Sequence, residues 1–492
     1  MEYALFKIDK MNIEAKNIFY NVVWKTGERF FSQFVAFVIS IVLARLLTPD
    51  DYGVIAMILV FINIADVFVQ SGFSSALIQK KDADQLDFST IFYCSALASV
   101  FIYFSLFLSA PLVGQFYNNE SIVLYLRVFS LKIPLSVYNS IQHAYVSRHM
   151  QFKRFFLSTL IGTIISGIIG VLMAYFGYGA WALITQYISN TVFDTLVLCV
   201  TVPWRPSLSF SLRRAKSLMS YGWKILAADL SGTFFGQLRN LIIGRYYTPS
   251  DLAFYSKGQQ FPLLVYNNVG VSIMSVLFPA ISNVGDDIEK AKRMTRRSMQ
   301  VITFILVPML MALAAIATPL IRLLLTNKWD DSIPFLQILC LGFSMAVLGI
   351  APFQALKAIG LGNVVLKLEF IKKPIFIVLL IIGVKISVLA TAVTMAAYEL
   401  YGVLVNSTQV KKYLNYTYRE QIHDVLPYVV ITAIMFVAML AVYIPSISNL
   451  LNIIIQLMVG FSIYILLSWL FKVEALVYLL KNFTKRNNEQ FD

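Results

Sequence analysis

Ionisable residues inside long apolar runs are the positions of this chain whose types could do chemistry. Asp66 and Arg239 lie farther from the ends of their runs than the others. A charge at the centre of a bilayer costs about 2.5–3.5 kcal/mol on insertion scales, so it usually faces a partner or a water-filled cavity. A cavity lined by such groups with a positive bias would attract an anionic substrate. The candidate lining residues are Arg29, Asp66, Gln70, Lys224, Arg239 and Lys257.

Three of these residues also have a structural interpretation. Arg29, Lys224 and Lys257 stand near the ends of their runs. Their charged heads could therefore reach the membrane interface while their aliphatic stems stay in the apolar region. The sequence leaves both interpretations open for them.

Acidic residues in the runs are candidates for coupling transport to a proton or a sodium ion. Asp66 and Glu399 are the two that we single out for this role. Hydrogen bonding between helices is the alternative for Glu399 and for Asp194, which has no charged neighbour at helical spacing. Glu369 and Lys373 are four residues apart, so we expect them to neutralise each other.

A sequence motif occurs twice, and this repeat suggests how the candidate residues are positioned. Residues 43–53 and 243–253 share Arg, Thr, Pro and Asp at identical spacing, each after one apolar run and before another. Trp-Lys pairs precede both copies in near register. A period this long fits two homologous halves of a membrane transporter.

The motif itself predicts a turn between two helices. Its proline would begin the second helix, Thr48 or Asp50 would cap that helix, and Asp51 would suit its dipole. Arg45 would then reach the headgroups or pair with Asp51. The alternative is a functional one, in which Arg45 and Arg245 flank the outer mouth of a cavity and attract an anionic substrate.

The composition requires a lipid environment. Of the 492 residues, 58% are hydrophobic and 13% are charged, whereas soluble domains carry roughly 25% charged residues. The net charge of +14 does not indicate nucleic-acid binding, because the basic residues form short clusters between apolar runs.

Cofactor and enzyme chemistry have no motif in the chain. Cys94, Cys199 and Cys340 all lie in apolar runs, and the three histidines are scattered. We therefore expect no metal site and no cofactor. The chain has no phosphate-binding loop, dinucleotide fingerprint or metalloprotease helix, so we do not expect an enzyme.

About fourteen apolar runs are long enough to cross a bilayer as helices. The prediction is thus an all-α integral membrane protein, with two homologous six-helix bundles of parallel orientation, two extra C-terminal helices and a central cavity between the halves. The runs lie near 28–47, 53–78, 88–113, 121–146, 155–176, 179–202, 220–246, 252–282, 298–325, 333–357, 364–384, 387–410, 426–445 and 450–471.

Basic residues gather in alternate loops, which predicts that both termini are cytoplasmic. The first 24 residues have helical spacing of apolar residues and interspersed lysines, which indicates an amphipathic helix on the cytoplasmic membrane surface. A frayed tail is the alternative. The predicted regions are 1–24, the N-terminal half 25–202, a cytoplasmic linker 203–219, the C-terminal half 220–410, two further helices in 411–471 and a basic tail 472–492.

Several short motifs follow one another in a characteristic order between about residues 20 and 410. They are Leu43–Gly53, Gly72 with Ala76–Gln79, Ser89–Thr90, Arg148–Arg154, Gly177–Trp181, Ser220–Gly222, Tyr255–Lys257 and Phe278–Pro279. In their order and spacing the chain resembles the polysaccharide flippases of the Wzx and WzxC type, within the multidrug/oligosaccharidyl-lipid/polysaccharide exporter superfamily.

The resemblance implies a function and a location. It implies translocation of an undecaprenyl-diphosphate-linked oligosaccharide across the bacterial cytoplasmic membrane by alternating access. The implied partners are this lipid-linked oligosaccharide and membrane lipids, with a polysaccharide polymerase and coupling to H⁺ or Na⁺ as further expectations. The alternatives are a cation-coupled drug or small-molecule exporter of the same superfamily, a lipid II flippase, and a membrane scaffold without transport activity.

Overall fold

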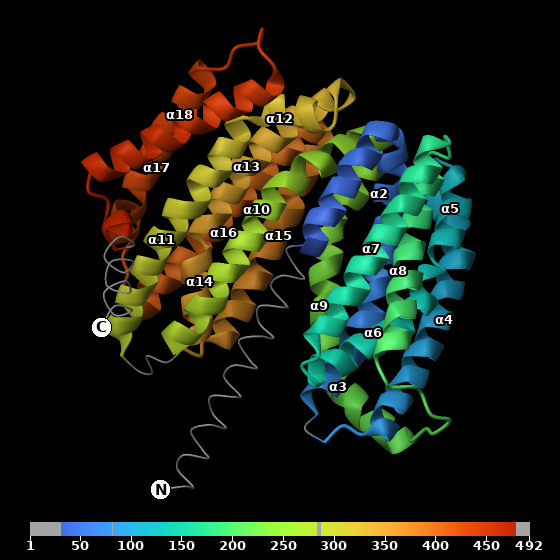
Figure 1. Ribbon diagram of the computed structural model, residues 1–492. Coiled ribbons are helices and arrows are strands. Elements are labelled where there is room, and N and C mark those ends of the chain that lie inside the picture. The colour runs from blue at the N-terminus through green and yellow to red at the C-terminus, as the bar shows by residue number, and fades with distance from the viewer. Residues whose placement is uncertain (1–30, 81, 283–286, 479–492) are drawn as a thin grey trace, which may run out of the picture. The chain divides into compact units, whose positions relative to one another are not determined.

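Helices make up nearly all of the chain that the computed structural model describes, which is residues 31–80, 82–282 and 287–478 (Figure 1). No strand occurs among these residues, so the predicted all-α fold is confirmed. Arg29, the predicted amphipathic segment 1–24 and the tail beyond residue 478 lie outside the described residues.

Contacts between Cα atoms group the helices into two units, residues 1–253 and 254–492. The first unit contains a helix at Phe31–Leu46, α2 (Pro49–Gln70), α3 (Gly72–Gln79), α4 (Gln85–Tyr117), α5 (Ser121–Phe129), α6 (Lys132–Arg148), α7 (Phe152–Tyr175), α8 (Ala180–Thr201), α9 (Leu212–Tyr246) and the start of α10 (Pro249–Ser282). The second contains the rest of α10, α11 (Ile288–Ala315), α12 (Ala317–Leu324), the 3₁₀ helix η1 (Asn327–Ser332), α13 (Ile333–Leu348), α14 (Ile350–Ala358), α15 (Gly362–Ile386), α16 (Val388–Leu414), α17 (Tyr418–Ala441) and α18 (Asn449–Leu470).

Ten helical segments of the described chain are long and apolar enough to cross a membrane, so the chain is a multi-pass membrane protein. The predicted number of about fourteen also counts the short helix at Phe31–Leu46 and helices α9, α10 and α15. Helix α15 carries five charged side chains along its length, namely Lys367, Glu369, Lys372, Lys373 and Lys385.

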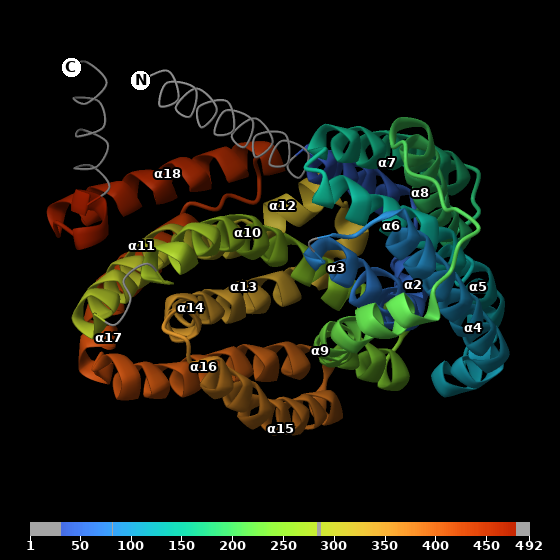
Figure 2. The same cartoon turned by 90° about the horizontal axis from the view of Figure 1, so that it is seen from below.

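The first unit is held together by close helix packing. Helices α7 and α8 run side by side in both views (Figures 1 and 2). Gly162 of α7 allows this approach, because a Cβ atom there would lie 3.1 Å from the backbone nitrogen of Asp194. Lipid chains are as apolar as the helix surfaces, so such van der Waals packing, rather than the hydrophobic effect, holds membrane helices together.

Helix α9 packs on α2, α3 and α4, which is why the contacts group it with the first unit. The sequence assigns this helix to the C-terminal half, after a linker at 203–219. The described linker is bound to the first unit: Trp204 is buried against Phe88, and its carbonyl accepts a hydrogen bond from Gln142 at 3.0 Å. The division into two sequence-homologous halves stays a prediction.

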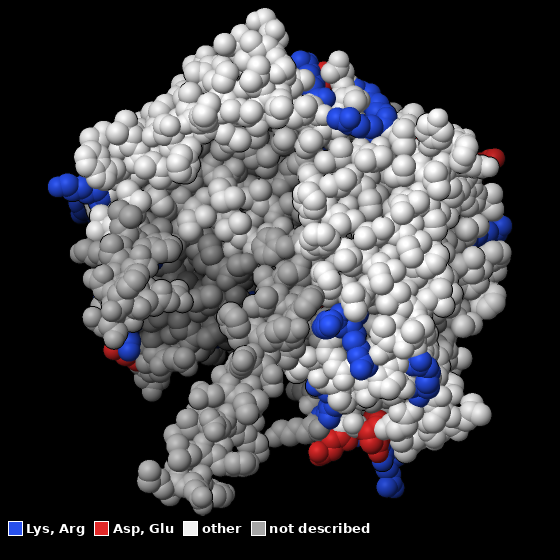
Figure 3. All heavy atoms as spheres, in the orientation of Figure 1, with Lys and Arg blue, Asp and Glu red and all other residues white. Residues whose placement is uncertain are grey.

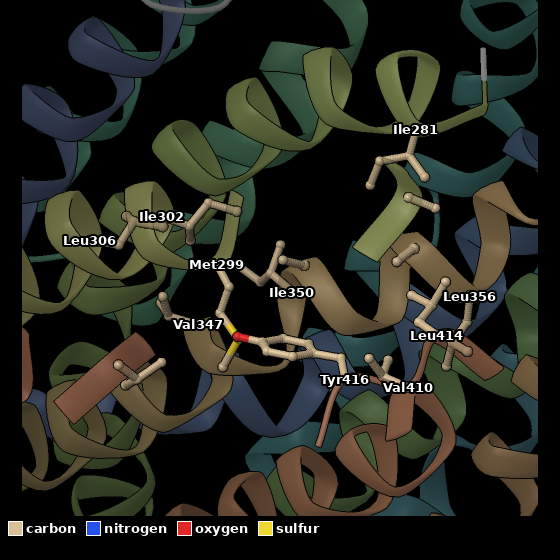
Figure 4. Packing of buried hydrophobic residues seen from close by; sticks show 14 of the residues in the cluster. Ile281, Met299, Ile302, Leu306, Val347, Ile350, Leu356, Val410, Leu414 and Tyr416 are labelled. Carbon is tan, nitrogen blue, oxygen red and sulfur yellow. The ribbon is translucent and has the colours of Figure 1, made fainter. Parts of the chain in front are cut away.

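The second unit has an apolar core in which α11, α13, α14 and α16 meet (Figure 4). Tyr416, fully buried, projects into this core beside Met299. Its hydroxyl donates to Asp424 of α17 at 2.7 Å, and Arg296 of α11 donates two further hydrogen bonds to the same carboxylate. This network joins α17 to α11 at the edge of the core.

Candidate functional site

Polar side chains of the first unit meet along one face of α6. Lys132, Asn139 and His143 are separated by seven and four residues, a spacing that places them on one side of a helix. They contact Asp66 of α2 and Asp194 of α8. Asp66 and Asp194 are therefore both held in helix-to-helix contacts with α6.

Asp66, the deepest acidic candidate in the sequence, forms an ion pair. The Lys132 amine donates to one carboxylate oxygen of Asp66 at 2.5 Å, and the two side chains are 17% and 14% exposed. Pro134 lies in the first turn of α6 and removes a backbone donor, so the α5–α6 span is interrupted next to Lys132. Pairing offsets much of the cost of burying each charge, and the pair as a whole is neutral.

Asp194 also has partners, and they lie on another helix, as the alternative of hydrogen bonding between helices predicts. Asn139 donates to one of its carboxylate oxygens at 2.5 Å, and Nε2 of His143 lies 3.2 Å from the same oxygen. The His143 ring packs on Phe155 of α7, with ring centroids 4.2 Å apart. Polar residues of α6 and α8 are thus linked through one carboxylate, and α7 packs against the His143 ring.

The second unit contains a polar cavity of about 460 Å³, lined mainly by α13, α14, α15 and α16. Ligand pockets commonly have volumes of this order. The carboxylates, amides, amine and phenols around it are suited to binding a cation, a proton or sugar hydroxyls. The polar lining residues are Tyr266, Gln354, Glu369, Lys372, Tyr398, Glu399 and Asn406.

The cavity contains an ion pair that the sequence pattern did not suggest. Glu369 accepts a hydrogen bond from Lys372 at 3.0 Å. The Lys372 side chain lines the cavity, and its amine also lies 5.2 Å from the ring of Phe353. Glu399, the second candidate for ion coupling, lines the same cavity from α16.

Lys257 is buried within its unit rather than extended toward an interface. Only 6% of the residue is exposed, and its amine donates to Gln260 at 3.2 Å. The amine also lies 5.8 Å from the ring of Trp329, which is fully buried. The interior position excludes simple snorkelling for this lysine.

Both copies of the repeated motif form the predicted helix start with the same geometry. The hydroxyl of Thr48 donates to Asp51 at 2.6 Å and accepts from its backbone N–H at 3.2 Å, and the second copy repeats both distances between Thr248 and Asp251. The prediction that Thr48 caps the helix is therefore confirmed, with Asp51 as its reciprocal partner.

The two copies also touch within the first unit. A Cβ atom on Gly53 would lie 1.8 Å from the carbonyl oxygen of Pro249, so only glycine allows this contact. Arg45 and Arg245 are both exposed, and the guanidinium of Arg245 lies 5.5 Å from the ring of Phe116. This geometry accounts for the motif as a structural turn, and a role of the two arginines toward substrate stays a prediction.

The remaining candidates occupy separate positions in the first unit. Gln70 is exposed at the end of α2, Lys224 is exposed on α9, and Arg239 is half-buried farther along α9. The sequence pattern missed the role of Asn139 and His143, although their spacing of four within an apolar run is a signal for a shared polar face.

The fold of the described chain is found in solved transporter structures. It is similar to a lipid II flippase MurJ in an inward closed conformation, with a TM-score of 0.74 and 15% identity over 91% of this chain and 98% of that one. It is also similar to a multidrug resistance MATE family transporter of the MOP superfamily in an inward-facing conformation, with a TM-score of 0.64 and 13% identity over 78% and 94% of the two chains. The chain thus shares the all-helical fold of these two membrane proteins.

The chain belongs to the polysaccharide biosynthesis protein family, whose model matches residues 42–334. It is 25% identical to the succinoglycan biosynthesis transport protein ExoT of Rhizobium meliloti (strain 1021), over 72% of this chain and 71% of the relative. It is 23% identical to the lipopolysaccharide biosynthesis protein WzxC of Escherichia coli (strain K12), over 70% of each chain. These findings confirm the resemblance to Wzx-type polysaccharide flippases.

Proposed function

We propose that this protein translocates a polyprenyl-diphosphate-linked oligosaccharide repeat unit, for O-antigen, capsule or exopolysaccharide synthesis, by alternating access. Such a substrate has a long apolar tail and a polar, anionic head, and the protein must accommodate both. The proposal places the protein in the bacterial cytoplasmic membrane with both termini in the cytoplasm. A polysaccharide polymerase would use the translocated product at the outer leaflet. The relatives in this family are named as transport and biosynthesis proteins, which supports a transporter rather than an enzyme.

The observation that carries the proposal is an apolar cavity of about 450 Å³ in the second unit, in addition to the polar one. Helix α11 forms one wall, and the two C-terminal helices α17 and α18 form the others. Pro308, Ala312 and Leu457 are among its apolar lining residues. A polar solute finds no hydrogen-bond partners in such a cavity, whereas a polyprenyl chain that fills it gains van der Waals contacts with the apolar lining.

Filling this cavity provides a test in cells that depend on the protein for surface polysaccharide. We expect Ala312→Phe to lower the amount of surface polysaccharide while the amount of membrane-inserted protein stays unchanged. The matched control is Leu450→Phe, which adds a ring at an exposed position of α18 that does not line the cavity. If both variants produced the same amount of surface polysaccharide, the cavity would no longer support the proposed function.

For the anionic head, we propose that the basic candidates Arg29, Lys224, Arg239 and Lys257 contribute positive potential along the route, with Arg45 and Arg245 at the outer mouth. Arg239→Ala, at constant protein level, should lower surface polysaccharide, because a diphosphate loses a partner at membrane depth. Polysaccharide at the wild-type level in this variant would argue against a substrate role for Arg239. Gln70 is proposed to hydrogen-bond the sugars.

A cation-coupled small-molecule exporter is the alternative that one observation favours. Glu399 and Glu369 lie in the same cavity, and acidic groups of this kind attract cations. In this alternative Glu399 or Asp66 carries the coupling ion and the cargo is a small cation. Export of a cationic dye by vesicles containing the purified protein would favour it, and movement of a lipid-linked glycan without dye export would contradict it. A lipid II flippase differs only in its cargo and is separated by offering lipid II in the same vesicles.

A further inference from the structure

A second apolar cavity lies in the first unit, outside the polar contacts of α6. It has a volume of about 1010 Å³ and lies between the first half of α4 and the start of α9. Cys94, Leu97 and Phe101 form its wall on α4, and Phe210 and Leu212 lie opposite. Leu97 and Phe101 are about three-quarters exposed, so this cavity opens on the surface of the unit.

The charged residue that lines this cavity is a lysine. Lys216 stands on α9 one turn after its first residue, and it is exposed. Within the described part of the chain it has no anionic partner, and the same holds for the neighbouring Arg213. Arg214 lies between these two residues and does have an anionic partner, because it donates a hydrogen bond to Asp84 at 2.5 Å. Lys216 thus places a positive charge that no carboxylate of the described chain neutralises beside the apolar wall.

The chain segment that forms the second wall is fixed in place. The backbone N–H of Ser211 donates to the hydroxyl of Thr90 at 3.2 Å, and Ser207 and Ser89 share a hydrogen bond at 3.0 Å. Between these anchors, Leu208 is fully exposed and Phe210 is half exposed. Apolar side chains held outward beside basic residues are typical of a segment that lies in the membrane interface. Figure 3 shows that much of the visible face carries no charged side chain, as a lipid-facing surface requires.

We propose that this cavity binds an anionic phospholipid, with an acyl chain along Leu97 and Phe101 and the phosphate at Lys216. Under the predicted topology the linker lies on the cytoplasmic side, so the lipid comes from the cytoplasmic leaflet. Charge complementarity selects an anionic headgroup over a zwitterionic one, since each lysine near the surface contributes about 1 kcal/mol toward an anionic membrane lipid. The site includes none of the residues that are proposed to contact the transported cargo.

The test measures phospholipids that stay bound to the purified full-length protein. The protein is mixed with phosphatidylglycerol or with phosphatidylcholine of the same acyl chains, and retained lipid is counted by native mass spectrometry. We expect the wild-type protein to retain phosphatidylglycerol preferentially. Lys216→Ala should weaken that retention about fivefold, and Lys216→Arg should restore it. The matched control is Lys290→Ala, which removes an exposed lysine at the start of another helix, α11.

A second variant separates lost charge from lost volume. Ala98→Trp places a large ring in the cavity without changing its charge, and it should also abolish preferential retention. Cys94 reports the location directly: with Cys199 and Cys340 replaced by serine and alanine, phosphatidylglycerol should slow its reaction with an apolar thiol reagent. The proposal is overturned if the two phospholipids are retained equally, if Lys290→Ala has the effect of Lys216→Ala, or if Cys94 reacts at the same rate with either lipid.

Discussion

The two units place charged residues at membrane depth in different ways. In the first unit, Asp66 and Asp194 are each held by a partner on another helix, through Lys132 and through Asn139 and His143. In the second unit, Glu369, Lys372 and Glu399 line a cavity of about 460 Å³.

The difference suggests different roles for the units. A charge that joins two helices contributes to packing, and moving it would break the contact, whereas a charge beside a cavity can meet a ligand without rearranging the fold. We therefore expect substitutions in the first unit to act mainly on stability and those in the second to act mainly on transport. The predictions below test this contrast, in order of the expected loss of stability.

The largest loss is expected for Lys132→Met. This change leaves Asp66 buried without its cation, which typically costs about 3–5 kcal/mol. The measurement is the yield and thermal midpoint of the detergent-solubilised protein. Adding Asp66→Leu should restore much of the stability, because an apolar pair avoids an uncompensated charge. A single variant as stable as wild type would contradict the scaffold role of this ion pair.

A smaller loss is expected for Asp194→Asn. The new amide oxygen can still accept from Asn139, but the contact with His143 loses its charge, for an expected cost of about 1–3 kcal/mol. The matched comparison is Asp229→Asn, which changes an exposed acid on α9. If thermal midpoints of the two variants are equal, the Asp194 cluster does not hold α6 and α8 together.

Glu399→Gln should leave stability nearly unchanged, within about 0.5 kcal/mol of wild type. Its expected effect is on transport: the rate should no longer respond to a proton or sodium gradient, because the amide cannot exchange a cation. The measurement is transport in vesicles with and without each gradient. If Glu399→Gln lost stability while its transport rate still responded to the gradients, the proposed contrast between the two units would be wrong.

The smallest effect is expected at the ion pair of Asp84, which precedes α4, and Arg214 of α9. The Arg214 hydrogen bond lowers the pKa of Asp84 from 3.8 to about 2. A lowered carboxyl pKa contributes stability above pH 3.8 that is lost as the pH falls toward 2. Both side chains are substantially exposed, so solvent screens the interaction. The variant Asp84→Asn keeps a helix-capping residue. Its thermal midpoint should lie slightly below that of the wild type at neutral pH and become equal to it near pH 2. A difference in thermal midpoint that grows as the pH falls would contradict this expectation.

Local features of the fold follow from the sequence. Apolar runs predict the helices because backbone N–H and C=O groups inside a membrane must form hydrogen bonds within the helix. The Thr-Pro-x-Asp spacing predicts both helix caps. Long-range features do not follow in this way. The contact of Asp194 with His143 depends on how α6 and α8 pack, and the pairing of Glu369 with Lys372 depends on which side of α15 faces the cavity. The grouping of α9 with the first unit likewise depends on how helices pack, because α9 contacts α2, α3 and α4.

The central claim, movement of a lipid-linked oligosaccharide, is tested most directly in vesicles containing only the purified protein. A polyprenyl-diphosphate-linked oligosaccharide with a labelled sugar is placed in the inner leaflet, and an added glycosidase detects the fraction that reaches the outer one. We predict that glycan exposure is faster with the wild-type protein than in protein-free vesicles and is slowed by Ala312→Phe but not by Leu450→Phe. Exposure at the protein-free rate, under every ion gradient tried, would contradict the account.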